Sequence, residues 1–155
     1  MKPWVHTTLI ALALSLPSLQ AEPAAALPAD ICCPEDQVRL IPSYVTVATA
    51  LAADDLQGAI DGAEDLGLWA ECSGEKTLDD AVADLERSRT LAEARIAFRT
   101  ISEQVIRLSR WFPGYYVMTC SEAKADWIQT DPEIANPYYG SKMLRSGTIK
   151  ESVGM

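Results

Sequence analysis

Histidine is almost absent from this chain of 155 residues. The single copy, His6, lies within the first 21 residues, which we interpret as a secretory signal. A mature chain without imidazole cannot form a Ser-His or Cys-His nucleophile pair or the usual zinc protease sites. Basic residues are also few, with 13 Lys and Arg against 22 Asp and Glu and a net charge of −9. Because nucleic acid and anionic lipid surfaces are bound by clustered Lys and Arg, we expect no nucleic-acid partner. Because the mature chain lacks imidazole, we expect no enzymatic activity.

Long hydrophobic runs are missing as well. The apolar run from Leu9 to Leu16 is too short to span a bilayer, which needs about 20 residues. With Lys2 before it and the small Ala21 after it, the run predicts a signal peptide over residues 1–21. An uncleaved membrane anchor is the alternative. We therefore expect a periplasmic or secreted protein with no stable membrane insertion after cleavage.

The chain has only four cysteines, namely Cys32, Cys33, Cys72 and Cys120. Four cysteines allow three connectivities, and an oxidising compartment favours pairing. Our preferred expectation is a bond from Cys32 or Cys33 to Cys72, ahead of two bonds or none. Residues 22–37 are rich in Pro and Ala at their start, and we expect a flexible leader there.

Apolar residues at helical spacing dominate the chain from Val38 to Phe112. They predict one helix over about 42–53, with Pro42 near its first turn, and a second that is capped by Asp54 or Asp55 and ended by Gly74. A third helical stretch begins at Thr77.

Thr90 and Glu93 match a capping box, so either a new helix begins there or one continuous helix changes phase. The pattern from Thr90 to Trp111 is that of a central bundle helix. We therefore expect an all-α fold, an up-down bundle of about four helices over residues 38–155 with an irregular C-terminal lid (residues 115–151).

The lid has β-prone segments at its two ends. Residues 115–120 (YYVMTC) and 148–153 (TIKESV) predict a small antiparallel pair of strands. Side chains alternate along a strand, so Met118 and Cys120 should share one face. Between the strands, Asp131-Pro132-Glu133 predicts a short helical turn, and a second turn should carry Met143.

This lid resembles the end of a bacterial family, the domain of unknown function three-three-four-seven. In that family a Cys-Pro-Met, a Trp, an Asn-Pro-Tyr-Tyr/Phe-Gly and a Met-Leu-x-Cys-Gly follow one another at similar spacing. The resemblance covers roughly residues 38–151 and implies association with the periplasmic adaptor subunits of heavy-metal efflux systems. The matching lid residues are Cys120, Trp127, Ile134, Asn136, Pro137, Tyr138, Tyr139, Gly140, Met143, Leu144 and Gly147.

The chain departs from the family pattern at the positions that would carry metal chemistry. Ser121-Glu122 stands where the family has Pro-Met, and Ser146 stands where it has the second Cys. If Ser146 occupies the place of that cysteine, it should lie near Cys120. A metal site inherited from the family would therefore have lost ligands here.

Thiolate and thioether are soft ligands that favour Cu(I) or Ag(I) over zinc. The candidate metal ligands are Cys120, then Met143, then Met118, and Glu122 offers a harder donor. The expected function is that of an exported, heavy-metal-efflux-associated protein that binds Cu(I) or Ag(I) weakly, with a periplasmic adaptor as partner. The alternative is a protein-interaction module whose metal ligands have been lost.

Overall fold

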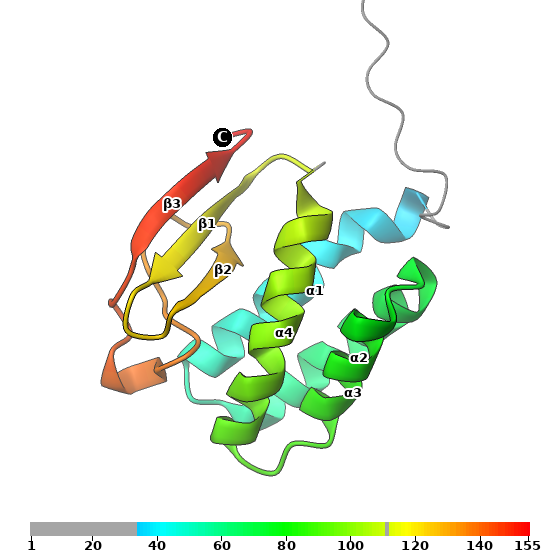
Figure 1. Ribbon diagram of the computed structural model, residues 1–155, viewed down its shortest axis with the longest axis horizontal. Coiled ribbons are helices and arrows are strands. Elements are labelled where there is room, and N and C mark those ends of the chain that lie inside the picture. The colour runs from blue at the N-terminus through cyan, green and yellow to red at the C-terminus, as the bar shows by residue number, and fades with distance from the viewer. Residues whose placement is uncertain (1–33, 111) are drawn as a thin grey trace, which may run out of the picture.

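The computed structural model describes residues 34–110 and 112–155. The expected signal peptide, Cys32 and Cys33 lie outside these ranges. The described residues form four α-helices, a 3-10 turn and three strands (Figure 1). Their bounds are α1 (Pro34–Ala52), α2 (Leu56–Ser73), α3 (Lys76–Glu86), α4 (Leu91–Ser109), β1 (Tyr115–Cys120), β2 (Ala125–Gln129), η1 (Gly140–Lys142) and β3 (Thr148–Val153).

The expectation of an all-α fold is wrong, because the C-terminal part contains a three-stranded antiparallel sheet in the order β2-β1-β3. The pairing of β1 with β3 is confirmed. The strand that the sequence pattern missed is β2, in which Trp127 and Ile128 are both fully buried. Neighbouring residues of a strand point to opposite faces, so β2 is covered on both faces and shows no alternation of apolar and polar residues.

The caps of the helices explain most of the helix boundaries. The carboxylate of Asp55 accepts a hydrogen bond from the N–H of Gly58 at 2.9 Å, and Gly74 ends α2 in the left-handed conformation, with φ 67°. The hydroxyl of Thr90 accepts from the N–H of Glu93 at 3.2 Å, and the Glu93 carboxylate accepts from the N–H of Arg89 at 2.8 Å. A separate helix therefore begins after Thr90, which settles the two alternatives.

Helix α1 begins earlier than expected. It starts at Pro34, inside the range expected to be a flexible leader, and Pro42 lies within it. Leu40 and Tyr44, on either side of Pro42, are both fully buried. Burial on both sides of the proline keeps the helix continuous despite the lost backbone donor.

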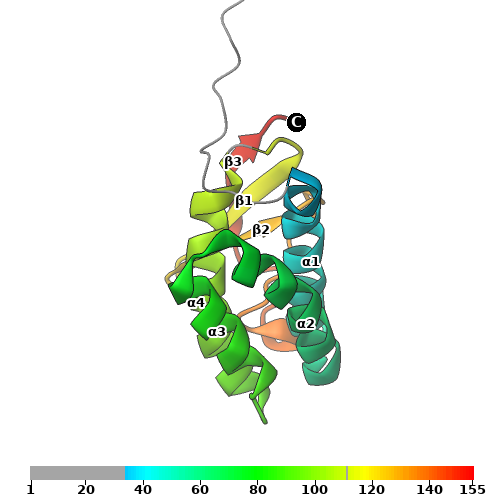
Figure 2. The ribbon, with the colours of Figure 1, turned by 90° about the vertical axis from the view of Figure 1, so that its right-hand side faces the viewer.

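The sheet docks on the helices through its β2 edge. The hydroxyl of Tyr44 on α1 accepts from the N–H of Ile128 at 3.2 Å. The hydroxyl of Ser102 on α4 donates to the carbonyl of Asp126 at 3.0 Å, and the hydroxyl of Tyr138 donates to the same carbonyl at 2.7 Å. Side chains thus satisfy the outer edge of β2. Figure 2 looks onto the four helices with the sheet behind them.

Candidate functional site

The candidate metal ligand Cys120 is the last residue of β1, and its side chain is buried. Its thiol donates to the carboxylate of Glu122 at 3.2 Å and lies 3.6 Å from the hydroxyl of Ser146. The expected proximity of Ser146 to Cys120 is therefore confirmed. The Glu122 backbone N–H, then the Cys120 thiol and the Ser121 hydroxyl, hold the pKa of the Glu122 carboxyl below its usual value.

The turn between β1 and β2 and the glycine at position 147 together place Glu122 and Ser146 beside Cys120. The tight turn between β1 and β2 has Lys124 in the left-handed conformation, with φ 48°. Arg99 on α4 holds this turn by donating to the carbonyls of Ala123 at 2.8 Å and Lys124 at 3.0 Å. At Gly147 (φ 136°) a Cβ atom would lie 2.7 Å from the Trp127 ring, so only glycine lets the returning chain pass close to the sheet. The residue before it, Ser146, is thereby placed beside the thiol.

The Asn-Pro-Tyr-Tyr-Gly motif forms a packed corner around Asn136, which is fully buried. Its side-chain amide donates to the carbonyl of Ser146 at 2.8 Å and accepts from the N–H of Tyr138 at 2.9 Å. Its backbone N–H donates to Leu144 at 2.8 Å, and its carbonyl accepts from Gly140 at 3.1 Å. All the polar groups of Asn136 thus form hydrogen bonds within the loop that leads to β3.

A charged clamp joins this corner to the helices. Arg95 on α4 donates to Asp54 at 2.5 Å, to the carbonyl of Leu51 at 2.8 Å and to the carbonyl of Pro137 at 2.9 Å. The second oxygen of Asp54 accepts from the N–H of Ser141 at 2.9 Å. Hydrogen bonds from Ser141 and Arg95 hold the pKa of Asp54 well below its usual value. The clamp fixes the lid to the turn between α1 and α2.

The three candidate sulfur ligands lie in different surroundings. Met118 is opposite Trp127 in the sheet and fully buried, and Cys120, two residues further along β1, is also buried. Met143 follows η1, and its residue is 37% exposed. Within residues 34–110 and 112–155, no three His, Cys, Asp or Glu side chains are grouped so that they could hold a metal ion.

The donors around Cys120 do not fit a tight Cu(I) site. Its polar neighbours are the carboxylate of Glu122 and the hydroxyl of Ser146, and both are hard oxygen donors. Cu(I) favours thiolate and thioether, and one thiol among oxygens supplies too few soft ligands. The structure thus places Cys120 beside Glu122 and Ser146, two residues at which the sequence departs from the expected ligand pattern.

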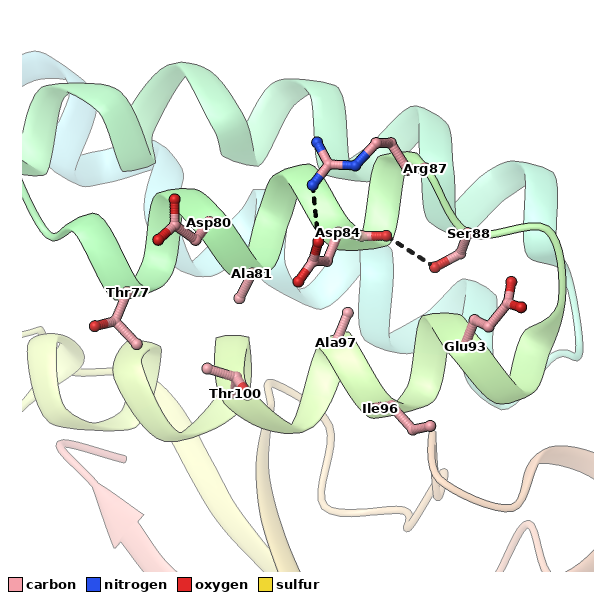
Figure 3. A pocket seen from close by; sticks show the side chains of 10 residues that line it. All are labelled: Thr77, Asp80, Ala81, Asp84, Arg87, Ser88, Glu93, Ile96, Ala97 and Thr100. Atoms are coloured by element: carbon pink, nitrogen blue, oxygen red, sulfur yellow. Dashed lines mark hydrogen bonds and ion pairs between the residues drawn. The ribbon is translucent and has the colours of Figure 1, made fainter.

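A second candidate site is an open groove of about 520 Å³ between α3 and α4, which the sequence pattern did not reveal. Figure 3 shows Ala81 and Ala97 pointing toward each other from the facing helices. Ile96, on the flank of α4, is 73% exposed. The groove is lined by Thr77, Asp80, Ala81, Asp84, Arg87, Ser88, Glu93, Ile96, Ala97 and Thr100.

One sequence signal could have pointed to this groove. The inward stripe of α4 includes Ala94, Phe98, Ile101 and Val105, which are all fully buried. Ile96 lies off that stripe, so the sequence places a large apolar side chain on the solvent side of the helix. A single exposed isoleucine is common on protein surfaces, and only the neighbouring helix α3 turns it into part of a groove.

None of the helices that the structure describes is long and apolar enough to cross a membrane. In comparisons with known proteins, no family model, no curated protein and no solved structure matches this chain.

Proposed function

We propose that this chain is a protein-interaction module that docks a segment of another protein in the groove between α3 and α4. The observation that carries the proposal is the groove itself, with small buried residues at its base and the exposed Ile96 on its flank. Ala81 and Ala97 leave space that side chains of a partner can enter. Covering apolar surface here contributes roughly 25 cal/mol per Å² before the costs of association.

The surroundings of Cys120 also support this proposal, because two expected sulfur ligands are replaced there. Glu122 and Ser146 stand at positions where the resembling family carries sulfur, and both contact the Cys120 thiol through oxygen. The corner at Asn136 and the clamp at Arg95 keep the lid folded through hydrogen bonds to protein groups. These hydrogen bonds join the lid to the helices and close its returning loop through protein groups. By the same resemblance, the proposed partner is a periplasmic adaptor of a metal-efflux system.

The test is a pull-down from periplasmic extract with matched variants. Wild type and Cys120→Ser should recover the same partner, because the thiol lies outside the groove. Ile96→Asp should lose the partner, because it places a charge on the docking surface. Leu68→Asp is the control, since Leu68 lies on α2, is 69% exposed and does not line the groove. Recovery of the partner by Ile96→Asp, or its loss from Cys120→Ser, would contradict the proposal.

A second candidate function is weak binding of Cu(I) or Ag(I) at Cys120. It is favoured by the approach of Ser146 to within 3.6 Å of the thiol, because a cysteine at that position would complete a pair of sulfur ligands. Reduced wild-type protein, titrated with Cu(I) without oxygen, should bind weakly and lose binding in Cys120→Ser. Met143→Leu and Met118→Leu then test whether either thioether contributes.

The sharper experiment restores the family residues. A double variant, Glu122→Met with Ser146→Cys, should bind Cu(I) at least about tenfold more tightly than wild type, because it adds two soft donors beside Cys120. If wild type binds no more Cu(I) than an unrelated acidic protein while the double variant binds tightly, the site has been lost in this chain. The interaction module is then the remaining proposal.

A further inference from the structure

We infer that the segment docked between α3 and α4 is a positively charged amphipathic helix of the partner protein. This inference rests on the proposed function and adds the chemistry of the partner. The apolar face of such a helix would cover the exposed Ile96, and its Lys or Arg side chains would meet the acidic rim of the groove. Three observations support this choice, namely the charge of the rim, the weakness of its present ion pairs and the shape of the groove.

The rim is acidic on both walls. Asp80 and Asp84 on α3 and Glu93 on α4 line the groove, against a single base, Arg87. Beyond the lining residues, α3 carries the acid Asp79 and the base Lys76, and Arg89 follows α3, while the Glu86 carboxylate lies beside Gly67 of α2. The lining side chains therefore carry a negative net charge, as does the whole chain, whose net charge is −9. A cationic segment is therefore attracted before contact and paired after it.

The ion pairs now present on the rim can be exchanged. Lys76 lies 2.7 Å from Asp80, and Arg87 lies 2.7 Å from Asp84 (Figure 3 draws the latter). The side chains of the Lys76–Asp80 pair are 81% and 60% exposed, and both members of the Arg87–Asp84 pair are 68% exposed. Exposed pairs of this kind contribute about 0–1 kcal/mol. A cation from a partner can thus replace either one at little cost.

The shape of the groove favours a helix over an extended strand. Two helices run side by side, from Lys76 to Glu86 and from Leu91 to Ser109, with Ala81 and Ala97 facing each other between them. Large side chains spaced three and four residues apart on a third helix fit between two such helices, as in other helix-in-groove complexes. An extended segment would instead seek a sheet edge, and neither wall of this groove is a strand.

Two other occupants fit the charges less well. A second copy of this chain would bring another net charge of −9 to an acidic rim. The chain's own residues 22–33 contain two acids, Glu22 and Asp30, and no Lys or Arg. A basic segment of a different protein is the complementary occupant.

The probe is a fluorescein-labelled amphipathic peptide of about 18 residues with Leu on one helical face and Lys on the other. Its binding to the full chain is measured by fluorescence anisotropy. The groove variant is Asp80→Asn with Asp84→Asn, and the matched control is Asp61→Asn with Asp65→Asn on α2, which changes the net charge equally away from the groove. We expect the groove variant to bind more than about fivefold more weakly and the α2 control to change less than about twofold.

Two further arms separate specific docking from general attraction. A peptide of the same composition in scrambled order, with no apolar face, should bind at least about tenfold more weakly than the amphipathic one. NMR shift changes on binding should map to α3 and α4. Equal weakening by the groove and α2 variants, equal binding of the scrambled peptide, or shifts confined to the sheet would each overturn the inference.

The outcomes also distinguish this inference from the proposed function. If Ile96→Asp loses the natural partner while the groove variant Asp80→Asn with Asp84→Asn keeps it, the groove docks a partner that is not basic. The inference then fails and the proposed function stands. If sedimentation shows a dimer of the wild type that Ile96→Asp converts to monomer, the occupant is a second copy, and that result also overturns the inference.

Discussion

Replacing Asn136 by alanine should destabilise the protein more than any other single polar change in the lid. Asn136 is fully buried, and its side chain bonds the N–H of Tyr138 and the carbonyl of Ser146. Asn136→Ala leaves both groups without these partners. A buried polar group left unsatisfied costs about 1–3 kcal/mol.

The two groups do not contribute equally. The bond to the Tyr138 N–H is buried, whereas the bond to the Ser146 carbonyl is only part-buried, so water can replace part of the second. We therefore expect a loss of about 2–3 kcal/mol in the free energy of unfolding. With a urea m-value of about 1–3 kcal/mol/M, the midpoint of unfolding should fall by about 0.7–3 M.

The assay is urea unfolding followed by circular dichroism and tryptophan fluorescence, together with hydrogen exchange at the Tyr138 amide. Thr130→Ala is the control, because the Thr130 residue is exposed and follows β2 outside the hydrogen bonds of Asn136. This control should lie within about 0.5 kcal/mol of wild type. A loss of less than about 0.5 kcal/mol for Asn136→Ala, with unchanged protection of the Tyr138 amide, would refute the reasoning.

Three further predictions test the contacts between the lid and the helices. The pKa of Asp54 is depressed in the folded state, so its contribution to stability is present above the unfolded value of about 3.9 and is lost as the pH falls toward the folded value. Asp54→Asn should therefore lower the urea midpoint at pH 7 more than at pH 3, and an equal effect at both would contradict this. Gly140→Ala should destabilise more than Gly74→Ala in thermal melts, because both residues have positive φ but only at Gly140 would a Cβ atom collide, 2.0 Å from an Asp54 oxygen. Tyr44→Phe should cost about 1–3 kcal/mol in urea unfolding, because the N–H of Ile128 loses its buried acceptor; a neutral result would show that this edge of the sheet does not depend on the hydroxyl.

The helices could be predicted because their signals are local. Asp55, Gly74 and Thr90 cap helices as their residue types suggest, and the apolar stripe of α4 is buried as its spacing indicates. The start of α1 was the exception, since Pro42 is a typical first-turn residue but here lies inside the helix. The burial of Leu40 and Tyr44 depends on segments far away in the chain, and no local pattern contains it.

The sheet could be predicted only in part. The β1 and β3 segments are bounded by glycine and have recognisable strand patterns, and their pairing is confirmed. β2 has no such pattern, because Trp127 and Ile128 are buried on opposite faces. The turn expected at Asp131 is a bend in which the Asp131 carboxylate accepts from the N–H of Glu133 at 2.7 Å, without a helical turn. The Asp131 side chain thus bonds a backbone N–H locally, and this bond favours a bend over a helical turn.

The sequence by itself determined the helix caps, the inward stripe of α4 and the two outer segments of the lid, because these follow from spacing within one segment. Only the tertiary structure decided that β2 joins the sheet and that an exposed isoleucine on α4 borders an acidic groove with α3. Each of these depends on segments that are separate in sequence and meet only when the helices and the sheet pack together.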